Sequence, residues 1–191
     1  MQNIRELHRR SVEAIRPVVT RVTPADLDRP TPCAGWDLRT LLAHMTGQDR
    51  GFAAAALADV PADAFAPGDP ATWEAGAAVV VAAFAAADPD RPVLMAEFGG
   101  TRFPLETVIG FHLLDTLVHG WDVAASLGVE VAYDDELLTA VRQQAELVPG
   151  GAVRTAPGAP FAPILSTVDD GWAGTLALLG RDVNWHALTP R

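Results

Sequence analysis

One apolar stretch, Leu105 to Gly128 (LETVIGFHLLDTLVHGWDVAASLG), constrains the fold more than any other part of the chain. Its apolar residues recur at helical spacing, and His112, Asp115 and His119 stand three and four residues apart on one helical face. A carboxylate and an imidazole in apolar surroundings need polar partners, because burying an unpaired polar group costs free energy. A divalent metal ion would satisfy both groups. The stretch therefore predicts a central helix that carries a metal site.

Spacing and breakers predict a mainly α fold. Four long helices with a small β-hairpin before the fourth indicate a helical bundle, followed by extra C-terminal helices. Gly99 and Gly100 indicate the turn of the hairpin. A chain of 191 residues, 49% of them hydrophobic, is expected to form one domain, with a core bundle over about 1–128 and an extension over about 129–191. The helices are expected at about 2–22, 38–57, 71–87, 104–127, 134–148 and 169–179, and the hairpin at 93–104.

Charge and cysteine usage exclude several classes of partner. The formal net charge of −10 and the pI of about 4.8 argue against nucleic acid and against anionic membranes, which both require a basic face. The single Cys33 excludes an internal disulfide and fits a reducing cytosol. Residues 1–16 are too charged for a signal peptide, and no apolar run of about 18 residues indicates a membrane span. We expect a cytoplasmic protein.

The metal site is expected to take a third ligand from another helix. His44 on the second long helix is the best candidate, although a core histidine bonded to a carbonyl is the simpler explanation of that residue alone. Three protein ligands would leave coordination positions open, which is the catalytic arrangement. His112 competes for a ligand role but lies about one turn earlier. Without a metal, Asp115 and His119 would form an acid–base dyad.

Further residues near these helices have a structural and a functional interpretation. Trp36 and Trp121 follow glycines; they either pack in the core or form the wall of a pocket mouth. Asp122 either orients the imidazole of a ligand or forms an ion pair with Arg181.

Two further residues are expected to be structural. Cys33 could be a thiol beside the metal or a nucleophile, but with no base beside it in sequence it is expected to be a small buried residue. His8 is expected to lie on the solvated face of the first helix.

Two stretches resemble a known family. One is PTPCAGWDLRTLLAH over 30–44, a Cys-x-Gly-Trp loop that leads to a histidine; the other is DTLVHGWDVA over 115–124. Together they resemble the DinB/YfiT-like metal-binding bundles and, within them, actinobacterial relatives of the mycothiol-dependent maleylpyruvate isomerase N-terminal domain. The resemblance covers residues 1–128, and the LLGRD sequence at 178–182 is similar to the tail of small members.

The resemblance implies a DinB-like four-helix bundle with one divalent ion, zinc or nickel, held by His44, Asp115 and His119. Mycothiol is the thiol cofactor that it suggests. The isomerase has a glutamate where this chain has Asp115, and the chain is shorter than the isomerase with its C-terminal domain. Both differences leave the thiol and the substrate open.

Three hypotheses on function follow. The first is a metal-dependent, thiol-dependent isomerase or transferase acting on a small molecule. The second is a non-catalytic metal-binding or small-molecule-binding protein, such as a stress-response bundle. The third is a buried polar network without metal. The exposed faces of the first and third helices could form a symmetric homodimer, which is the commonest assembly of soluble proteins. The sequence itself leaves the oligomeric state open.

Overall fold

The computed structural model describes residues 1–156, 159–166 and 171–187. The predicted mainly helical fold is confirmed. Its helices are α1 (Gln2–Val19), α2 (Leu38–Leu57), α3 (Trp73–Ala86), α4 (Leu105–Leu127), α5 (Asp135–Leu147) and α6 (Trp172–Leu178), with short 3₁₀ turns η1 (Ala62–Phe65), η2 (Pro70–Thr72), η3 (Ala96–Phe98) and η4 (Gly151–Arg154). Within these residues no helix is both long enough and apolar enough to cross a membrane.

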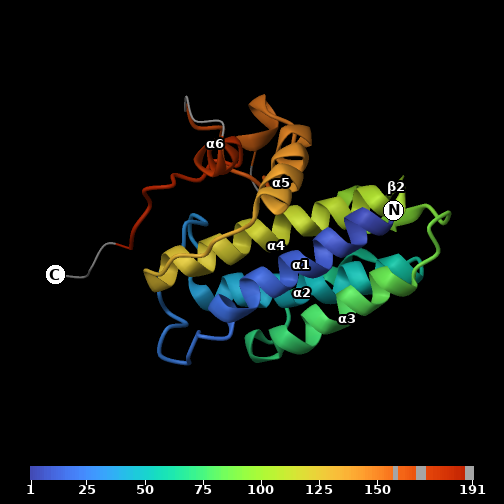
Figure 1. Ribbon diagram of the computed structural model, residues 1–191, viewed down its shortest axis with the longest axis horizontal. Helices are drawn as coiled ribbons and strands as arrows, with labels where there is room; N and C mark the ends of the chain where they lie inside the picture. Colours follow the sequence, from blue (N-terminus) through green and yellow to red (C-terminus); the bar gives the residue numbers. More distant parts are fainter. Residues whose placement is uncertain (157–158, 167–170, 188–191) are drawn as a thin grey trace.

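The four long helices form a bundle, in which consecutive helices are not always neighbours (Figure 1). Helix α2 packs against α3 and α4, and α1 packs against α4 and α3. The pairs α1–α2 and α3–α4 therefore lie across the diagonals of the bundle. This arrangement explains the long connections at 20–37 and 87–104, because a chain that crosses a diagonal needs more than a tight turn.

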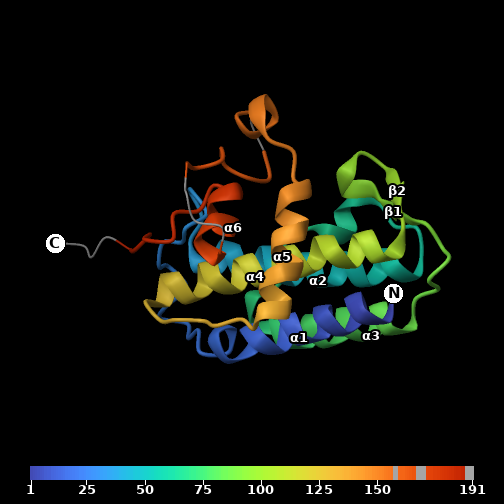
Figure 2. The ribbon, with the colours of Figure 1, turned by 45° about the horizontal axis from the view of Figure 1, so that its top comes forward.

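The predicted β-hairpin lies between α3 and α4. Strands β1 (Val93–Met95) and β2 (Thr101–Phe103) pair antiparallel, with Leu94 opposite Arg102. Gly99 and Gly100 have φ angles of 70° and 77°, a region that residues with a Cβ rarely adopt. Turn η3 widens the tip of the hairpin. In Figure 2 the hairpin lies toward the N-terminal half of α4, and α6 lies toward its C-terminal half.

Helices α1 and α4 approach closely at Gly120. A Cβ atom added there would lie 2.2 Å from Cγ2 of Ile15, which is far inside van der Waals contact. The hydroxyl of Tyr133, 3.1 Å from the same added Cβ atom, donates a hydrogen bond to the carbonyl of Leu117 at 2.7 Å. Central helix α4 is therefore packed tightly along the turns that carry Asp115 and His119.

The C-terminal extension covers α4 with α5 and α6. Helix α5 crosses α4 steeply (Figure 2), and α6 packs against α5. Buried Arg154 holds the Pro/Gly-rich loop between them, since its guanidinium donates to the carbonyls of Pro149, Val148, Ala162 and Leu178. Burial lowers the pKa of Arg154. The described part of this loop is therefore anchored by a buried arginine.

The helix ends agree with the sequence within a few residues. Asp37 and Asp134, which stand at the predicted starts of two helices, cap α2 and α5 through their side chains. Helix α1 ends at Val19, three residues before the predicted end. The predicted start of the last helix, at 169, lies outside the described residues.

Candidate metal centre

Helices α2 and α4 bring together the three predicted ligands. Nε2 of His44 lies 3.5 Å from Oδ1 of Asp115, and Nε2 of His119 lies 3.2 Å from the same oxygen. The ligand atoms of all three residues lie within 4.8 Å of one another. Residues 75 positions apart in sequence thus converge because α2 and α4 are neighbours in the bundle.

The donor set fits a divalent metal ion. Two ligand atoms that are each about 2.0–2.1 Å from a tetrahedral ion are about 3.4 Å apart, and the two nitrogen–oxygen distances are close to that value. Two imidazoles and one carboxylate are ligands of zinc and of related ions. The side chains of His44 and Asp115 remain 25% and 24% exposed, so a small molecule can approach from their side.

The charges of these residues are strongly coupled. Burial alone raises the pKa of Asp115, but the imidazoles of His119 and His44 outweigh it and hold this pKa well below its usual range. Burial lowers the pKa of His119, whereas the carboxylates of Asp115 and Asp122 raise it well above its ordinary value. A proton held on His119 is therefore the competitor of a metal ion.

Asp122 contacts both of the residues that were considered as its partners, His119 and Arg181. Its Oδ2 accepts a hydrogen bond from Nδ1 of His119 at 2.8 Å and forms an ion pair with Nη2 of Arg181 at 3.1 Å. Asp122 is completely buried, and Arg181 is 7% exposed. Burial raises the pKa of Asp122, but Arg181 and His119 lower it below its ordinary value. The bond to Nδ1 turns Nε2 of His119 toward Asp115.

The expectation for Cys33 was wrong. The thiol is partly exposed; it donates to Oδ2 of Asp122 at 3.2 Å and lies 4.0 Å from Nδ1 of His119. Cys33, His119 and Asp122 also form a group with metal-ligand spacing. However, Nη2 of Arg181 lies 3.3 Å from this sulfur, and its positive charge disfavours a second cation there. Sequence reasoning missed the contact because its partners are 86 to 148 residues away.

The two tryptophans have different positions. The Trp36 ring lies 5.0 Å from the His44 ring and stacks near His119 at 6.3 Å, so it forms a wall beside the candidate ligands. Trp121 is 9% exposed, and no ring contact within the described residues joins it to the three ligands. The role of Trp121 at a pocket mouth stays a prediction.

His112 belongs to a second polar cluster. Its Nδ1 lies 2.7 Å from Nε2 of His8, and its Nε2 lies 3.1 Å from Oδ1 of Asp49. All three are at most 4% exposed. The expectation that His8 is solvated was wrong, because Phe84 packs on its ring at 4.8 Å. The sequence did contain one indication of this cluster. Asp49 is an acid on the buried side of α2, and a buried carboxylate needs a polar partner.

The His8 cluster predicts a dependence of stability on pH. Burial and the neighbouring His112 lower the pKa of His8 well below 6.5 in the folded state. Below about pH 6.5 the unfolded chain therefore binds a proton that the native state rejects, and the free energy of unfolding falls by up to about 1.4 kcal/mol per pH unit. In metal-free His8→Phe this loss is expected to disappear. Urea denaturation at pH 7, 6 and 5 checks it, and equal slopes in both proteins would contradict it.

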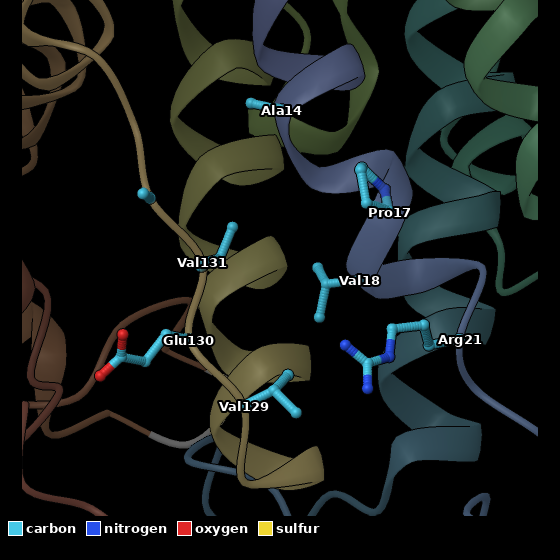
Figure 3. A pocket seen from close by; sticks show the side chains of 8 residues that line it. Ala14, Pro17, Val18, Arg21, Val129, Glu130 and Val131 are labelled. Atoms are coloured by element: carbon cyan, nitrogen blue, oxygen red, sulfur yellow. The ribbon is translucent and has the colours of Figure 1, made fainter.

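A depression lies outside the candidate metal centre. It has a volume of about 200 Å³ and lies between α1 and the segment that follows α4; Figure 3 shows Pro17, Val18, Arg21 and Val129 around it, with Glu130 at its edge. None of the candidate ligands lines it. It therefore makes no contribution to the site on α2 and α4.

The fold and the site define a helical-bundle protein with a candidate metal centre. A sequence model of the family described as "Mycothiol maleylpyruvate isomerase N-terminal domain" matches residues 8–124, more than half of the chain. The chain belongs to this family. The resemblance inferred from residues 30–44 and 115–124 is thereby confirmed.

Relatives and solved structures agree with this assignment. The uncharacterized proteins MT0763 and Rv0738 of Mycobacterium tuberculosis, from strains CDC 1551 / Oshkosh and ATCC 25618 / H37Rv, are each 30% identical over 155 residues, 81% of this chain and 84% of theirs. The crystal structure of the mycothiol-dependent maleylpyruvate isomerase matches 75% of this chain and 67% of its own, with a TM-score of 0.59 and 15% identity. A histidine-to-alanine mutant of that isomerase matches with a TM-score of 0.60. At this identity the structures show a shared fold.

Proposed function

We propose that this protein is a metal-dependent enzyme that uses a thiol, mycothiol or another low-molecular-weight thiol, to isomerise or transfer a small molecule. The observation that carries the proposal is the convergence of His44, Asp115 and His119, with ligand atoms within 4.8 Å of one another. Family membership and the fold shared with a mycothiol-dependent isomerase support the choice of reaction.

The residues of the candidate centre would have separate roles in binding the metal, orienting a ligand and excluding solvent. His44, Asp115 and His119 would hold one zinc or nickel ion, and Asp122 would keep Nε2 of His119 directed at it. A bound divalent ion supplies Lewis acidity and lowers the pKa of a thiol or water. Trp36 would shield one side of the ligands from solvent. The proton held on His119 in the metal-free protein would leave on metal binding, so metal affinity should fall as the pH decreases.

The test is a metal and thiol titration of protein purified without a polyhistidine tag. Elemental analysis should find about one divalent ion per chain. After substitution with cobalt, an added thiol should produce a charge-transfer band in the near ultraviolet. Protein that binds neither zinc, nickel nor cobalt at pH 8 would refute the proposal and leave a buried polar network.

A non-catalytic metal-binding protein is the second candidate. The partial exposure of His44 and Asp115 favours an enzyme, because a purely structural ion is enclosed by protein ligands. A protein that binds one ion but neither thiol nor substrate would instead support this second candidate.

We also infer that residues 1–191 form one domain, with the bundle at about 1–128 and the extension at about 129–191. The ion pair between Arg181 of the extension and Asp122 of α4 supports this inference. A single unfolding transition, detected by both circular dichroism and tryptophan fluorescence, is the expected behaviour.

A further inference from the structure

The tip of the β-hairpin lies beside the candidate metal centre. Gln48 is one turn after His44 on α2 and is only 4% exposed. Its Nε2 donates a hydrogen bond to Oε1 of Glu97 in η3 at 3.0 Å. A buried amide thus holds the Glu97 carboxylate at the rim of the α2 face that carries a predicted ligand.

The same tip also contacts α4. The ring of Phe98 lies 5.5 Å from that of Phe111, at an interplanar angle of 72°. Phe111 is one turn before Asp115, and Phe103 of β2 contacts it at 5.3 Å. The hairpin is therefore attached to both helices that supply the candidate ligands, one turn from His44 and one turn from Asp115.

Glu97 also interacts electrostatically with the site. Burial raises the pKa of Glu97, the amide of Gln48 lowers it, and the charges of Asp115 and His44 act on it in opposite directions. The hydrogen bond to Gln48 places this carboxylate about one helical turn from His44 along α2, where its negative charge can act on a charged molecule bound at His44 and Asp115.

Positive side chains are scarce at this site. The sequence contains no lysine, so its 14 basic residues are all arginines. Arg181 lies beside Cys33 and Asp122, but its charge is already compensated in a buried ion pair with Asp122. Within the described residues, no arginine forms a hydrogen bond or an ion pair with His44, Asp115, His119 or Glu97. An anionic molecule would therefore meet Glu97 without a matching cation from the protein.

We propose that Glu97, held by Gln48, makes the site select small molecules that are neutral or positively charged and reject carboxylates. The inference rests on the proposed function, which it deepens by naming the class of substrate. Maleylpyruvate, a dicarboxylate, is a poor substrate for such a site.

Three small thiols of different charge test the selection. Cobalt-substituted protein at pH 8 and low salt is titrated with cysteamine (cationic), 2-mercaptoethanol (neutral) and 3-mercaptopropionate (anionic), and the charge-transfer band gives each Kd. Every thiol is compared with itself in wild type and in Glu97→Gln, so that differences in thiol acidity cancel. In the variant, we expect the affinity for cysteamine to fall and that for 3-mercaptopropionate to rise, each by about three- to tenfold. The affinity for 2-mercaptoethanol should stay within about twofold.

The matched control is Glu130→Gln, which makes the same change in net charge at the depression of Figure 3. It should leave all three affinities unchanged. If cobalt and thiols bind but Glu97→Gln changes all three affinities equally, or none of them, the inference on charge selection is wrong and the proposed function stands. Absence of cobalt binding or of any thiol band would refute the proposed function, and the inference with it.

Discussion

His119→Ala is expected to lower the affinity for zinc or nickel by more than about a hundredfold, because loss of groups that merely orient a ligand already costs about 10–100-fold. The variant removes one of the three donors and the partner of both Asp115 and Asp122. Elemental analysis after dialysis against a weak chelator measures the remaining metal. Circular dichroism must show that the variant keeps its helices.

His112→Gln is the matched control for this experiment. It removes a histidine from the same helix, seven residues earlier, whose contacts are with His8 and Asp49. It should destabilise the protein but retain the metal. Equal metal content in His119→Ala and wild type, or equal metal loss in both variants, would contradict the assignment of the site.

Arg181→Met is expected to lower the free energy of unfolding by about 3–5 kcal/mol, because it removes the arginine that compensates the buried charge of Asp122. Asp122 is completely buried and receives two hydrogen bonds from the guanidinium, at 3.1 and 3.4 Å. Urea denaturation measures the change. Because Asp122 orients His119, metal affinity should fall as well.

Two controls separate this effect from a general loss of charge. Arg102→Met breaks an ion pair with Asp59 in which both side chains are 48% exposed, and it should cost less than about 1 kcal/mol. Asp122→Asn combined with Arg181→Met also removes the buried negative charge and should recover part of the stability. A loss below about 1 kcal/mol in Arg181→Met would show that Asp122 is not dependent on this partner.

Much of the fold follows from local sequence patterns. The helical periodicity of 105–127, the Asp37 and Asp134 caps and the Gly99–Gly100 turn act over a few residues, so the sequence alone indicates them. The spacing of Asp115 and His119 likewise determines that both project from one face of a helix. These expectations are met in the structure.

The two wrong expectations, for His8 and Cys33, concern residues whose neighbours in the structure are far away in sequence. His8 has the polar character of a surface residue, but Phe84 and His112 enclose it. Cys33 has no base beside it in sequence, yet Asp122 and Arg181 lie within 3.3 Å of its sulfur. Local hydrophobic patterns carry no information on which polar face meets which helix.

The sequence by itself thus determined the helices, the hairpin and the shared face of Asp115 and His119, because helical spacing is a local property, and the resemblance of residues 30–44 to a known family added His44 as a candidate ligand. Only the tertiary structure decided how they are used. Packing of α2 against α4 brings His44 beside the other two ligands, whereas His112 contacts His8 and Asp49 in a separate cluster. Folding of the extension brings Arg181 to Asp122, and the hairpin brings Glu97 to Gln48. Such contacts depend on how whole helices are positioned relative to one another. Those positions are set when the helices bury their apolar faces in a shared core.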